Sequence, residues 1–178
     1  MNDKALISRV LVDDDHHAFA ALVRKHQQSI LHFLRRLTGG NSALADDIAQ
    51  QVFISAYDKL STFRAEAGFN TWLHSIAYRS FLNEMRKSHH HTEVALTDDV
   101  LAPSIRDSVE QELLIEKLMA RLSVTERTCM TLAYSAGMSH QEIVDVTQLP
   151  LGTVKSHINR GKHKLTKWVQ QSQSRRKS

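Results

Sequence analysis

The sequence predicts an all-α protein made of two small helical domains joined by a flexible linker, the second of them a helix-turn-helix domain. Only two prolines, Pro103 and Pro150, interrupt the 178 residues, so long stretches contain no helix breaker. Apolar residues recur at helical spacing throughout, whereas the alternation typical of strands is weak. Between about residues 88 and 107 this periodicity gives way to polar residues, which is typical of a linker.

The first domain is expected over residues 1–88. It should contain a short helix over 4–11 and three longer helices, for which the expected N-caps are Asp15, then Asn41 or Ser42, then Asn70. Gly39 and Gly40 should end the first long helix, because glycine commonly follows the last helical turn. The segment 62–68 is expected to be a loop before the last helix of this domain.

The second domain is expected over residues 108–171, after a linker at 89–107 and before a basic tail at 172–178. Two capping boxes mark helix starts within it: Ser123 with Glu126, and Ser139 with Glu142. A short helix, a turn of about four residues that ends at Pro150, and a second helix over 151–168 then give the helix-turn-helix pattern.

The last helix is expected to carry the DNA-binding function. One face is apolar, with Val154, Ile158, Gly161, Leu165 and Trp168 at spacings of three and four. The opposite face presents Lys155, Ser156, Asn159, Arg160 and Lys162. Cationic side chains suit phosphates or guanine edges, and Asn suits adenine. No Asp or Glu follows Asp145, although the net charge of the whole chain is only +4.

Several function classes are disfavoured by the composition. Cys129 is the single cysteine, which excludes an internal disulfide and a zinc quartet. The triplet His89–His91 has no partner acid or thiol, so it is interpreted as ordinary linker. No membrane span or secretory signal is recognised. We therefore expect a cytoplasmic, nucleoid-associated protein with no membrane insertion, no cofactor and no metal.

At this point the chain resembles a known family. Residues 139–143 and 149–156, which read SHQEI and LPLGTVKS, resemble region 4 of bacterial RNA polymerase sigma factors. Residues 46–53, which read DDIAQQVF, together with Tyr57 resemble the polymerase-binding helix of region 2. Residues 71–77, which read TWLHSIA, resemble the segment before the promoter-melting helix of region 2. The closest resemblance is to the extracytoplasmic-function class, which has only regions 2 and 4.

The resemblance implies partners and roles. Region 4 should read the promoter −35 element through Lys155, Ser156, Asn159, Arg160 and Lys162, and region 2 should melt the −10 element, with candidates Arg64, Arg79, Asn83 and Arg86. Stacking is expected from Phe63, Phe69, Trp72 and Tyr78, although core packing is the favoured interpretation of Trp72. The protein should bind the clamp helices and the flap of core RNA polymerase. The residues expected to contact the clamp helices are Asp46, Asp47, Gln50, Gln51 and Phe53.

One departure from the family pattern concerns charge. The polymerase-binding helix of the family usually carries acids where this chain has Leu44 and Gln51. One interpretation is tolerated variation. The other is conditional activity, in which a protein kinase phosphorylates Thr62 or Ser61, or Ser55 on the helix itself, and so supplies about −1.5 to −2 of charge. An anti-sigma factor is a further candidate regulator.

Two alternatives remain from the sequence. The first is a stand-alone helix-turn-helix regulator that binds duplex DNA as a dimer, which would need a dimerisation surface. The second is an enzyme, which the eleven histidines suggest. No metalloprotease spacing, glycine-rich phosphate loop or nucleophile motif accompanies them, so no catalytic residue is expected.

Overall fold

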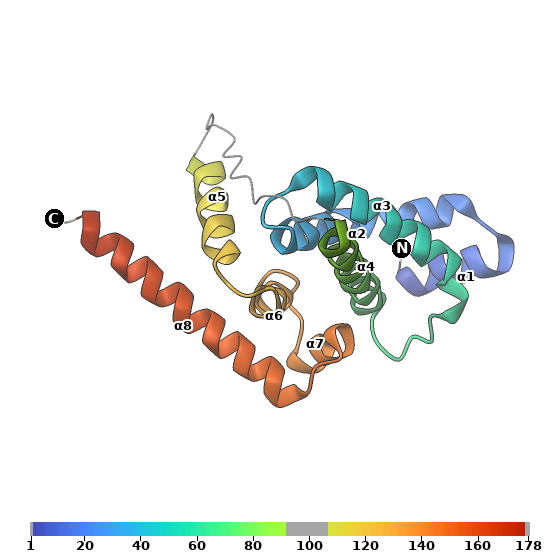
Figure 1. Ribbon diagram of the computed structural model, residues 1–178. Coiled ribbons are helices and arrows are strands. Elements are labelled where there is room, and N and C mark those ends of the chain that lie inside the picture. The colour runs from blue at the N-terminus through green and yellow to red at the C-terminus, as the bar shows by residue number, and fades with distance from the viewer. Residues whose placement is uncertain (1, 92–106, 177–178) are drawn as a thin grey trace.

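The computed structural model describes residues 2–91 and 107–176, and over these residues it contains helices and no strand (Figure 1). In chain order the elements are α1 (Asp3–Asp13), α2 (His16–Leu37), α3 (Ser42–Asp58), the short 3-10 helix η1 (Leu60–Thr62), α4 (Phe69–His91), α5 (Asp107–Ala120), α6 (Val124–Tyr134), α7 (His140–Thr147) and α8 (Leu151–Arg176). The prediction of an all-α fold with two helical domains is confirmed.

The N-terminal domain packs α2, α3 and α4 around one apolar core, with α1 lying against α2. Its fully buried side chains include Phe33, Leu34, Val52, Leu73 and Phe81. Helix α1 is fixed to α2 by Asp3, whose carboxylate accepts hydrogen bonds from Lys25 Nζ at 2.7 Å and from the ring of His26 at 3.2 Å.

Most expected helix ends of this domain are where the sequence places them. Asp15 accepts a hydrogen bond from the backbone N–H of Ala18, and Asn41 caps α3. Helix α2 ends at Leu37, and both Gly39 and Gly40 adopt the left-handed backbone that glycine tolerates.

Two expectations about α4 are wrong. The helix begins at Phe69, and Asn70 lies inside its first turn rather than at its cap. The helix also continues through His91, so the backbone of the histidine triplet is its last turn rather than linker. The reason is that no Gly or Pro follows before Pro103, so nothing at residue 88 forces the helix to stop.

The C-terminal domain is assembled from α5 to α8, and α6 packs most extensively on α8. Both capping boxes are formed as predicted, at Ser123 with Glu126 and at Ser139 with Glu142. Gly137 follows α6 with a φ of +66°, as expected of a glycine at a helix C-terminus. The core of this domain includes Leu132, Ile143 and Val154.

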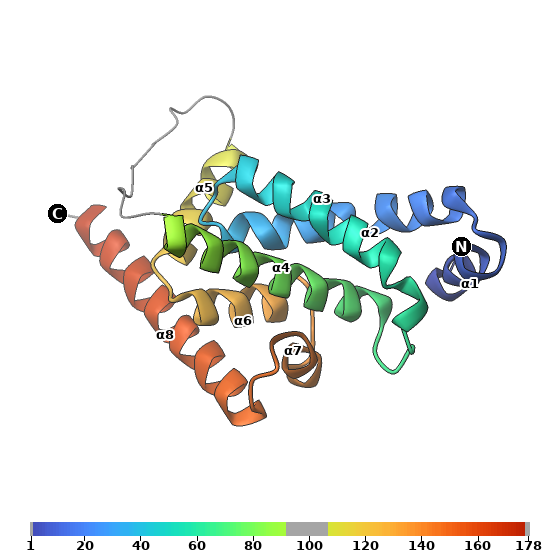
Figure 2. The same cartoon turned by 45° about the vertical axis from the view of Figure 1, so that its right-hand side comes forward.

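The two domains contact each other directly, which the sequence did not predict. Helix α4 lies between α3 on one side and α6 and α7 on the other, and α8 runs along the outer edge (Figure 2). The most extensive contacts between the domains are those of α4 with α7 and of α2 with α6. No helix within residues 2–91 and 107–176 is both long and apolar enough to cross a membrane.

Candidate nucleic-acid interface

The helix-turn-helix is formed by α7 and α8. The turn consists of Gln148, Leu149 and Pro150, one residue shorter than predicted. Gln148 closes α7 in the left-handed conformation, at φ +59°, and its N–H donates to the carbonyl of Val144 at 2.7 Å. The hydroxyl of Thr147 donates to Ile143 O and accepts from the N–H of Leu149. These local bonds fix the angle at which α8 leaves the turn.

One face of α8 is buried and the other is exposed, as predicted. Val154 and Ile158 are buried in the domain core, and Gly161 approaches α6 so closely that an added Cβ would lie 2.7 Å from Met130 Cγ. The exposed side chains are Lys155, Ser156, Asn159, Arg160 and Lys162. The structure therefore brings all five candidates for −35 recognition together on one solvent-facing side of a single helix.

Two lysines near the middle of α8 differ in their contacts. Lys162 Nζ lies 5.9 Å from the ring centre of Tyr134, a residue at the end of α6 that is 60% exposed. Lys164 instead binds the carboxylate of Glu126, at 2.8 Å and 3.0 Å. Lys162 is thus available to an external anion, whereas Lys164 is engaged within the domain.

Arg64 and Arg79 line one hollow between the 62–67 loop and α4. Its wall also contains Phe63 and Trp72, and it is bordered by Asp145 of α7. Both arginines are exposed. A hollow with cationic and aromatic walls suits a nucleotide, because the phosphate meets the cations and the base can stack on the rings.

The aromatic residues expected to stack on bases fall into two groups. Phe63 and Trp72 are half-buried, with ring centres 5.4 Å apart, and both line the hollow. Phe69 and Tyr78 are buried, at 6% and 8% exposed, so the expectation that they stack on DNA is corrected: they are core residues. Burial also raises the pKa of the Tyr78 hydroxyl.

The remaining candidates for −10 binding, Asn83 and Arg86, do not line this hollow. Asn83 lines a groove between α3 and α4, together with Ser80, Glu84 and Lys87 of α4. Arg86 is exposed. The structure therefore brings Arg64 and Arg79 together and places Asn83 at a different surface.

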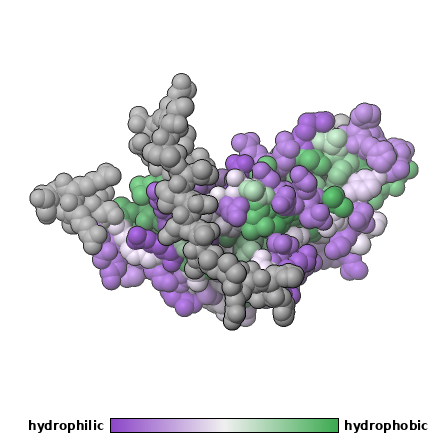
Figure 3. Space-filling model, turned by 45° about the horizontal axis from the view of Figure 1, so that its top comes forward, coloured by the Kyte–Doolittle hydropathy of each residue, from purple (hydrophilic) through white to green (hydrophobic). Residues whose placement is uncertain are grey.

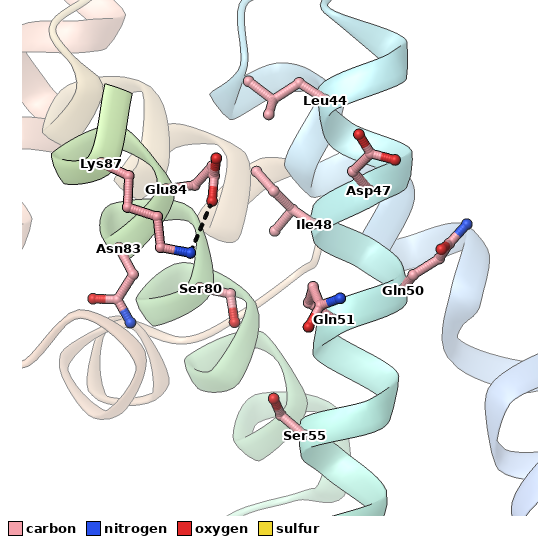
Figure 4. A pocket seen from close by; sticks show the side chains of 10 residues that line it. All are labelled: Leu44, Asp47, Ile48, Gln50, Gln51, Ser55, Ser80, Asn83, Glu84 and Lys87. Atoms are coloured by element: carbon pink, nitrogen blue, oxygen red, sulfur yellow. Dashed lines mark hydrogen bonds and ion pairs between the residues drawn. The ribbon is translucent and has the colours of Figure 1, made fainter. Parts of the chain in front are cut away.

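The groove between α3 and α4 carries most of the predicted polymerase-binding residues. Leu44, Ile48, Gln51 and Ser55 lie on the side of α3 that faces α4, and Gln50 points away from it (Figure 4). The exposed face of α3 includes Asp46, Asp47, Gln50 and Gln51. Asp46 lies 3.7 Å from Arg35 of α2, an exposed pair that leaves both groups accessible.

Phe53, the fifth predicted member of this set, is half-buried, whereas its neighbour Ile54 is 55% exposed. Both border a shallow apolar depression between α2 and α3, which also contains Phe19 and Val23. Apolar patches are interspersed with polar surface at this end of the molecule, on the right-hand side of Figure 3. Sequence reasoning missed Ile54, although its spacing of four residues from Gln50 places both on one helix face.

The candidate phosphorylation sites lie at and beyond the end of α3. Ser61 and Thr62 are exposed in η1, and the hydroxyl of Thr62 donates to Lys59 O at 2.7 Å. Ser55 is half-buried in the α3–α4 groove, one helical turn from Gln51. Within the described residues, no group of three or more His, Cys, Asp or Glu side chains is arranged to hold a metal ion.

Comparison with known families accounts for both domains. Residues 22–91 match the model of sigma-70 region 2, and residues 112–165 match sigma-70 region 4. The two matches occur in this order on either side of the 92–106 segment. The region 4 match includes the helix-turn-helix, and the region 2 match includes α3, α4 and the 62–67 loop, which together with α4 lines the hollow that contains Arg64 and Arg79.

Individual relatives agree over nearly the whole length. The RNA polymerase sigma-H factor of Pseudomonas aeruginosa is 31% identical, over 94% of each chain. The ECF RNA polymerase sigma factor SigW of Bacillus subtilis is 33% identical, over 86% of this chain and 89% of that protein. Among solved structures, RpoE from Bartonella quintana, in complex with the anti-sigma factor NepR, has the same fold, with a TM-score of 0.76 at 20% identity over 85% of this chain and 96% of that chain.

Proposed function

The chain belongs to the extracytoplasmic-function class of RNA polymerase sigma factors, and we propose that it reads the −35 element with α8 and melts the −10 element beside α4. In this role it supplies binding free energy, while the catalytic groups belong to the polymerase. The stand-alone dimeric regulator is not favoured, because the region 2 model accounts for residues 22–91, which that alternative would leave without a specific role.

The observation that carries the proposed −35 recognition is the exposed face of α8. Lys155, Ser156 and Asn159 occupy its first turns, where a recognition helix reaches the base edges. Arg160 and Lys162 follow, at positions suited to phosphate contacts. Because Lys164 is bound to Glu126, it is not included in the proposed interface.

The proposed −10 contact is the hollow that contains Arg64 and Arg79. Unstacking a base costs a few kcal/mol, which a pocket with stacking and phosphate contacts can offset. Phe63 and Trp72 supply aromatic surface at this hollow. Asn83 and Arg86 are proposed to contact DNA outside it, along the same helix.

For the polymerase we propose the exposed surface of α3, including the α3 side of its groove with α4, as the contact of the clamp helices, with region 4 on the flap. Asp46 and Asp47 supply negative charge, Gln50 and Gln51 supply polar contacts, and Ile54 with the half-buried Phe53 supplies apolar surface. A charged rim sets the encounter rate and the register, while buried apolar area slows dissociation. Leu44 and Gln51 leave this surface with less negative charge than the family usually has.

The test is run-off transcription from genomic fragments with purified core polymerase, with start sites mapped. We expect discrete starts that depend on this protein, and loss of polymerase binding in Ile54→Asp. Val12→Asp is the matched control, because Val12 is 77% exposed on α1 and lies outside the proposed contact. A protein that fails to bind core polymerase but binds a palindromic duplex tightly contradicts the proposal.

We also propose two regulatory partners. An anti-sigma factor is one, because RpoE from Bartonella quintana, which shares this fold, was solved in complex with the anti-sigma factor NepR. A protein kinase that phosphorylates Ser61 or Thr62 is the other, since both hydroxyl-bearing residues are exposed. Association with the nucleoid follows from promoter binding and is proposed with it.

A further inference from the structure

The hollow that contains Arg64 and Arg79, here called the −10 hollow, has an aromatic wall that is backed by a buried ring. Phe63 and Trp72 line the hollow, whereas Phe69, at the start of α4, does not. The ring centre of Phe69 is 5.6 Å from that of Phe63, in an edge-on arrangement, and 5.5 Å from that of Trp72. Because Phe69 is only 6% exposed, it supports the two rings of the wall from the protein side.

A histidine of α2 lies on the inner side of Phe69. The ring centres of His26 and Phe69 are 5.2 Å apart at an interplanar angle of 68°, so the edge of one ring meets the face of the other. His26 is 8% exposed, and the other buried residues of α2 are all apolar. An imidazole in such a place needs a hydrogen-bond partner, because burial of a polar group without one costs free energy.

The partner of His26 is Asp3, in the first turn of α1. One carboxylate oxygen of Asp3 lies 3.2 Å from His26 Nε2, and the other accepts a hydrogen bond from Lys25 Nζ at 2.7 Å. Since a carboxylate can only accept, the Nε2 of the imidazole carries a proton and donates. This bond sets the rotation of the imidazole, and therefore the way in which its ring meets Phe69.

Helix α1 also supports the other half of the aromatic wall. It contacts η1, the 3-10 turn that leads directly into Phe63. Leu6, Ile7 and Val10 are buried on its inner face, and Leu60 of η1 is 1% exposed. Figure 2 shows α1 at the end of the N-terminal domain from which the loop before α4 projects. The elements that carry Phe63 and Phe69 thus both rest on α1 or on its partner residue in α2.

The pair formed by Asp3 and His26 is not needed merely to cover the core. Replacing both members of a buried polar pair with apolar groups of the same shape is often nearly neutral for stability. Helix α1 lies outside the residues that match the region 2 model, which begin at residue 22. None of the residues proposed to contact DNA or polymerase lies on α1. A polar bond between α1 and the back of the aromatic wall therefore calls for a role of its own.

The stacking of an unpaired base depends on how well the aromatic wall is held. Phe63 and Trp72 are half-buried, so each ring has one side toward the hollow and another toward its support. Side chains that must be ordered at the moment of binding reduce affinity, whereas rings that are already fixed do not. A support behind the wall thus contributes to binding of the base without touching it.

We propose that Asp3 and His26 are positioning residues for the −10 hollow, which act through Phe69 to hold Phe63 and Trp72 in the orientation that stacks on an unpaired base. The inference rests on the proposed function, because it requires that the hollow receives a base of the −10 element. It adds α1 to promoter melting, as a helix that acts without contacting DNA.

Three substitutions separate positioning of the wall from simple attachment of α1. His26→Gln keeps an N–H that can reach Asp3 but removes the ring behind Phe69. Asp3→Ala keeps that ring but removes its hydrogen-bond partner. Lys25→Met is the matched control, because Lys25 binds the same carboxylate of Asp3 from the exposed surface of α2.

The readout is the contribution of one unpaired base to binding by the holoenzyme. Forked templates carry the mapped promoter with its −10 element unpaired, and each −10 base of the non-template strand is replaced in turn by an abasic site. For the wild type we expect one position at which the abasic site lowers affinity by about tenfold or more, as for one stacked base. At that position His26→Gln and Asp3→Ala should lose about threefold or less, and Lys25→Met should lose as much as the wild type.

The design distinguishes positioning from general damage to the fold. A damaged fold weakens binding to the intact and the abasic templates by the same factor. That result, or an equal effect of all three substitutions, or full base dependence in His26→Gln and Asp3→Ala, overturns the positioning role. A wild-type holoenzyme for which no −10 base matters contradicts the proposed −10 hollow itself, so the two failures are distinguishable.

A second measurement uses the free protein and needs no promoter. Trp72 and Trp168 are the two tryptophans of the chain, so Trp168→Phe leaves Trp72 as the single fluorescent reporter of the wall. In this background His26→Gln and Asp3→Ala should shift the emission of Trp72 to longer wavelength and increase its quenching by acrylamide. Lys25→Met should change neither. Emission and quenching that stay the same in all variants contradict the proposed coupling.

Discussion

The ammonium group of Lys164 contacts both carboxylate oxygens of Glu126, at 2.8 Å and 3.0 Å, and thereby ties α8 to the start of α6. Glu126 is only 3% exposed and also forms the capping box with Ser123. Burial alone would raise the pKa of this carboxyl, but the bonds from Lys164 and Ser123 hold it below its ordinary value. A lysine on a basic helix thus has a structural role within the domain.

Lys164→Met should therefore destabilise the protein, while Lys162→Met should weaken DNA binding. Removing the partner of a buried carboxylate leaves it uncompensated, and because Lys164 is itself partly exposed we expect a loss of about 1–3 kcal/mol. Urea unfolding of the full chain measures this loss. Lys162→Met should leave the stability of the protein unchanged. In promoter binding by the holoenzyme, it should reduce the slope of log affinity against log salt concentration by roughly one, which corresponds to one released counterion. The assignment fails if the two variants exchange these effects.

Gly161 permits the close contact of α8 with α6. In Gly161→Ala the new Cβ would lie 2.7 Å from Met130 Cγ, so we expect a loss of about 1–3 kcal/mol from overpacking. Gly152→Ala is the matched control, because nothing lies within 4 Å of the added carbon and helix propensity should favour it by about 0.5–1 kcal/mol. In the double variant with Met130→Ala, the loss of stability should be smaller than the sum of the losses in the two single variants. If the two losses simply add, Met130 does not clash with the new Cβ.

His74 should make stability depend on pH. Burial lowers its pKa to about 4, despite the hydrogen bond to Asn70 O, so the folded protein holds the ring neutral. The unfolded chain binds a proton with a pKa near 6.5. Stability from this residue is therefore fully present above about pH 6.5 and is lost as the pH falls toward 4. Between pH 7 and pH 5 the loss is about 2 kcal/mol.

The measurement is chemical unfolding at a series of pH values. His74→Leu should remove most of that pH-dependent loss, whatever its effect on stability at pH 7. His163→Gln, on the exposed side of α8, should leave the pH dependence as in the wild type. A His74→Leu profile that remains as steep as the wild-type profile contradicts the attribution.

Gln51→Glu should strengthen binding to core polymerase. The side chain is exposed, in the groove that contains Asp47, where the family usually has an acid. An exposed ion pair is worth about 0.2–1 kcal/mol, so we expect up to about fivefold tighter binding, mostly through a faster association that disappears at high salt. Gln27→Glu, on the exposed surface of α2, controls for net charge. Equal affinities for both variants would show that charge at position 51 is not limiting.

Thr62→Glu should have a smaller effect than Gln51→Glu. From Gln51 to the end of α3 at Asp58, the helix alone rises about 10 Å, which exceeds the Debye length of about 8 Å at physiological salt. A phosphate on Thr62 therefore acts at the far end of the α3 face and does not replace the charge at position 51. Indistinguishable polymerase binding by wild type, Thr62→Ala and Thr62→Glu, with no phosphate on the protein in cells, removes the kinase hypothesis.

Local signals in the sequence predicted most of the secondary structure. The caps at Asp15, Ser123 and Ser139 and the glycine at 137 were correct because these residues act on backbone groups within one helical turn. The predicted cap at Asn70 was wrong because asparagine, although common at helix N-caps, also occurs inside helices. The apolar face of α8 was predicted for the same local reason, since spacing along a helix determines which residues share a side.

The surfaces that depend on tertiary contacts were predicted less well. The buried state of Tyr78 and the exposure of Ile54 depend on which helices pack against α4 and α3. Asn83 and Arg79 lie at different surfaces because α4 faces α3 on one side and the 62–67 loop with α7 on another. The domain contact itself was not predicted, because Arg127 resembles an ordinary surface arginine until its acceptors are known.

The guanidinium of Arg127 in α6 donates to main-chain carbonyls of α2, those of Arg36 and Leu37, and this affects how the contact between the domains can evolve. Substitutions at positions 36 and 37 change side chains but leave the carbonyls that Arg127 binds. The two sides of the bridge are thus not obliged to change together, and pairs of covarying positions across homologues would not reveal it. A substitution at position 127 alone removes this contact, so a lineage can lose or regain it without a matching change in α2.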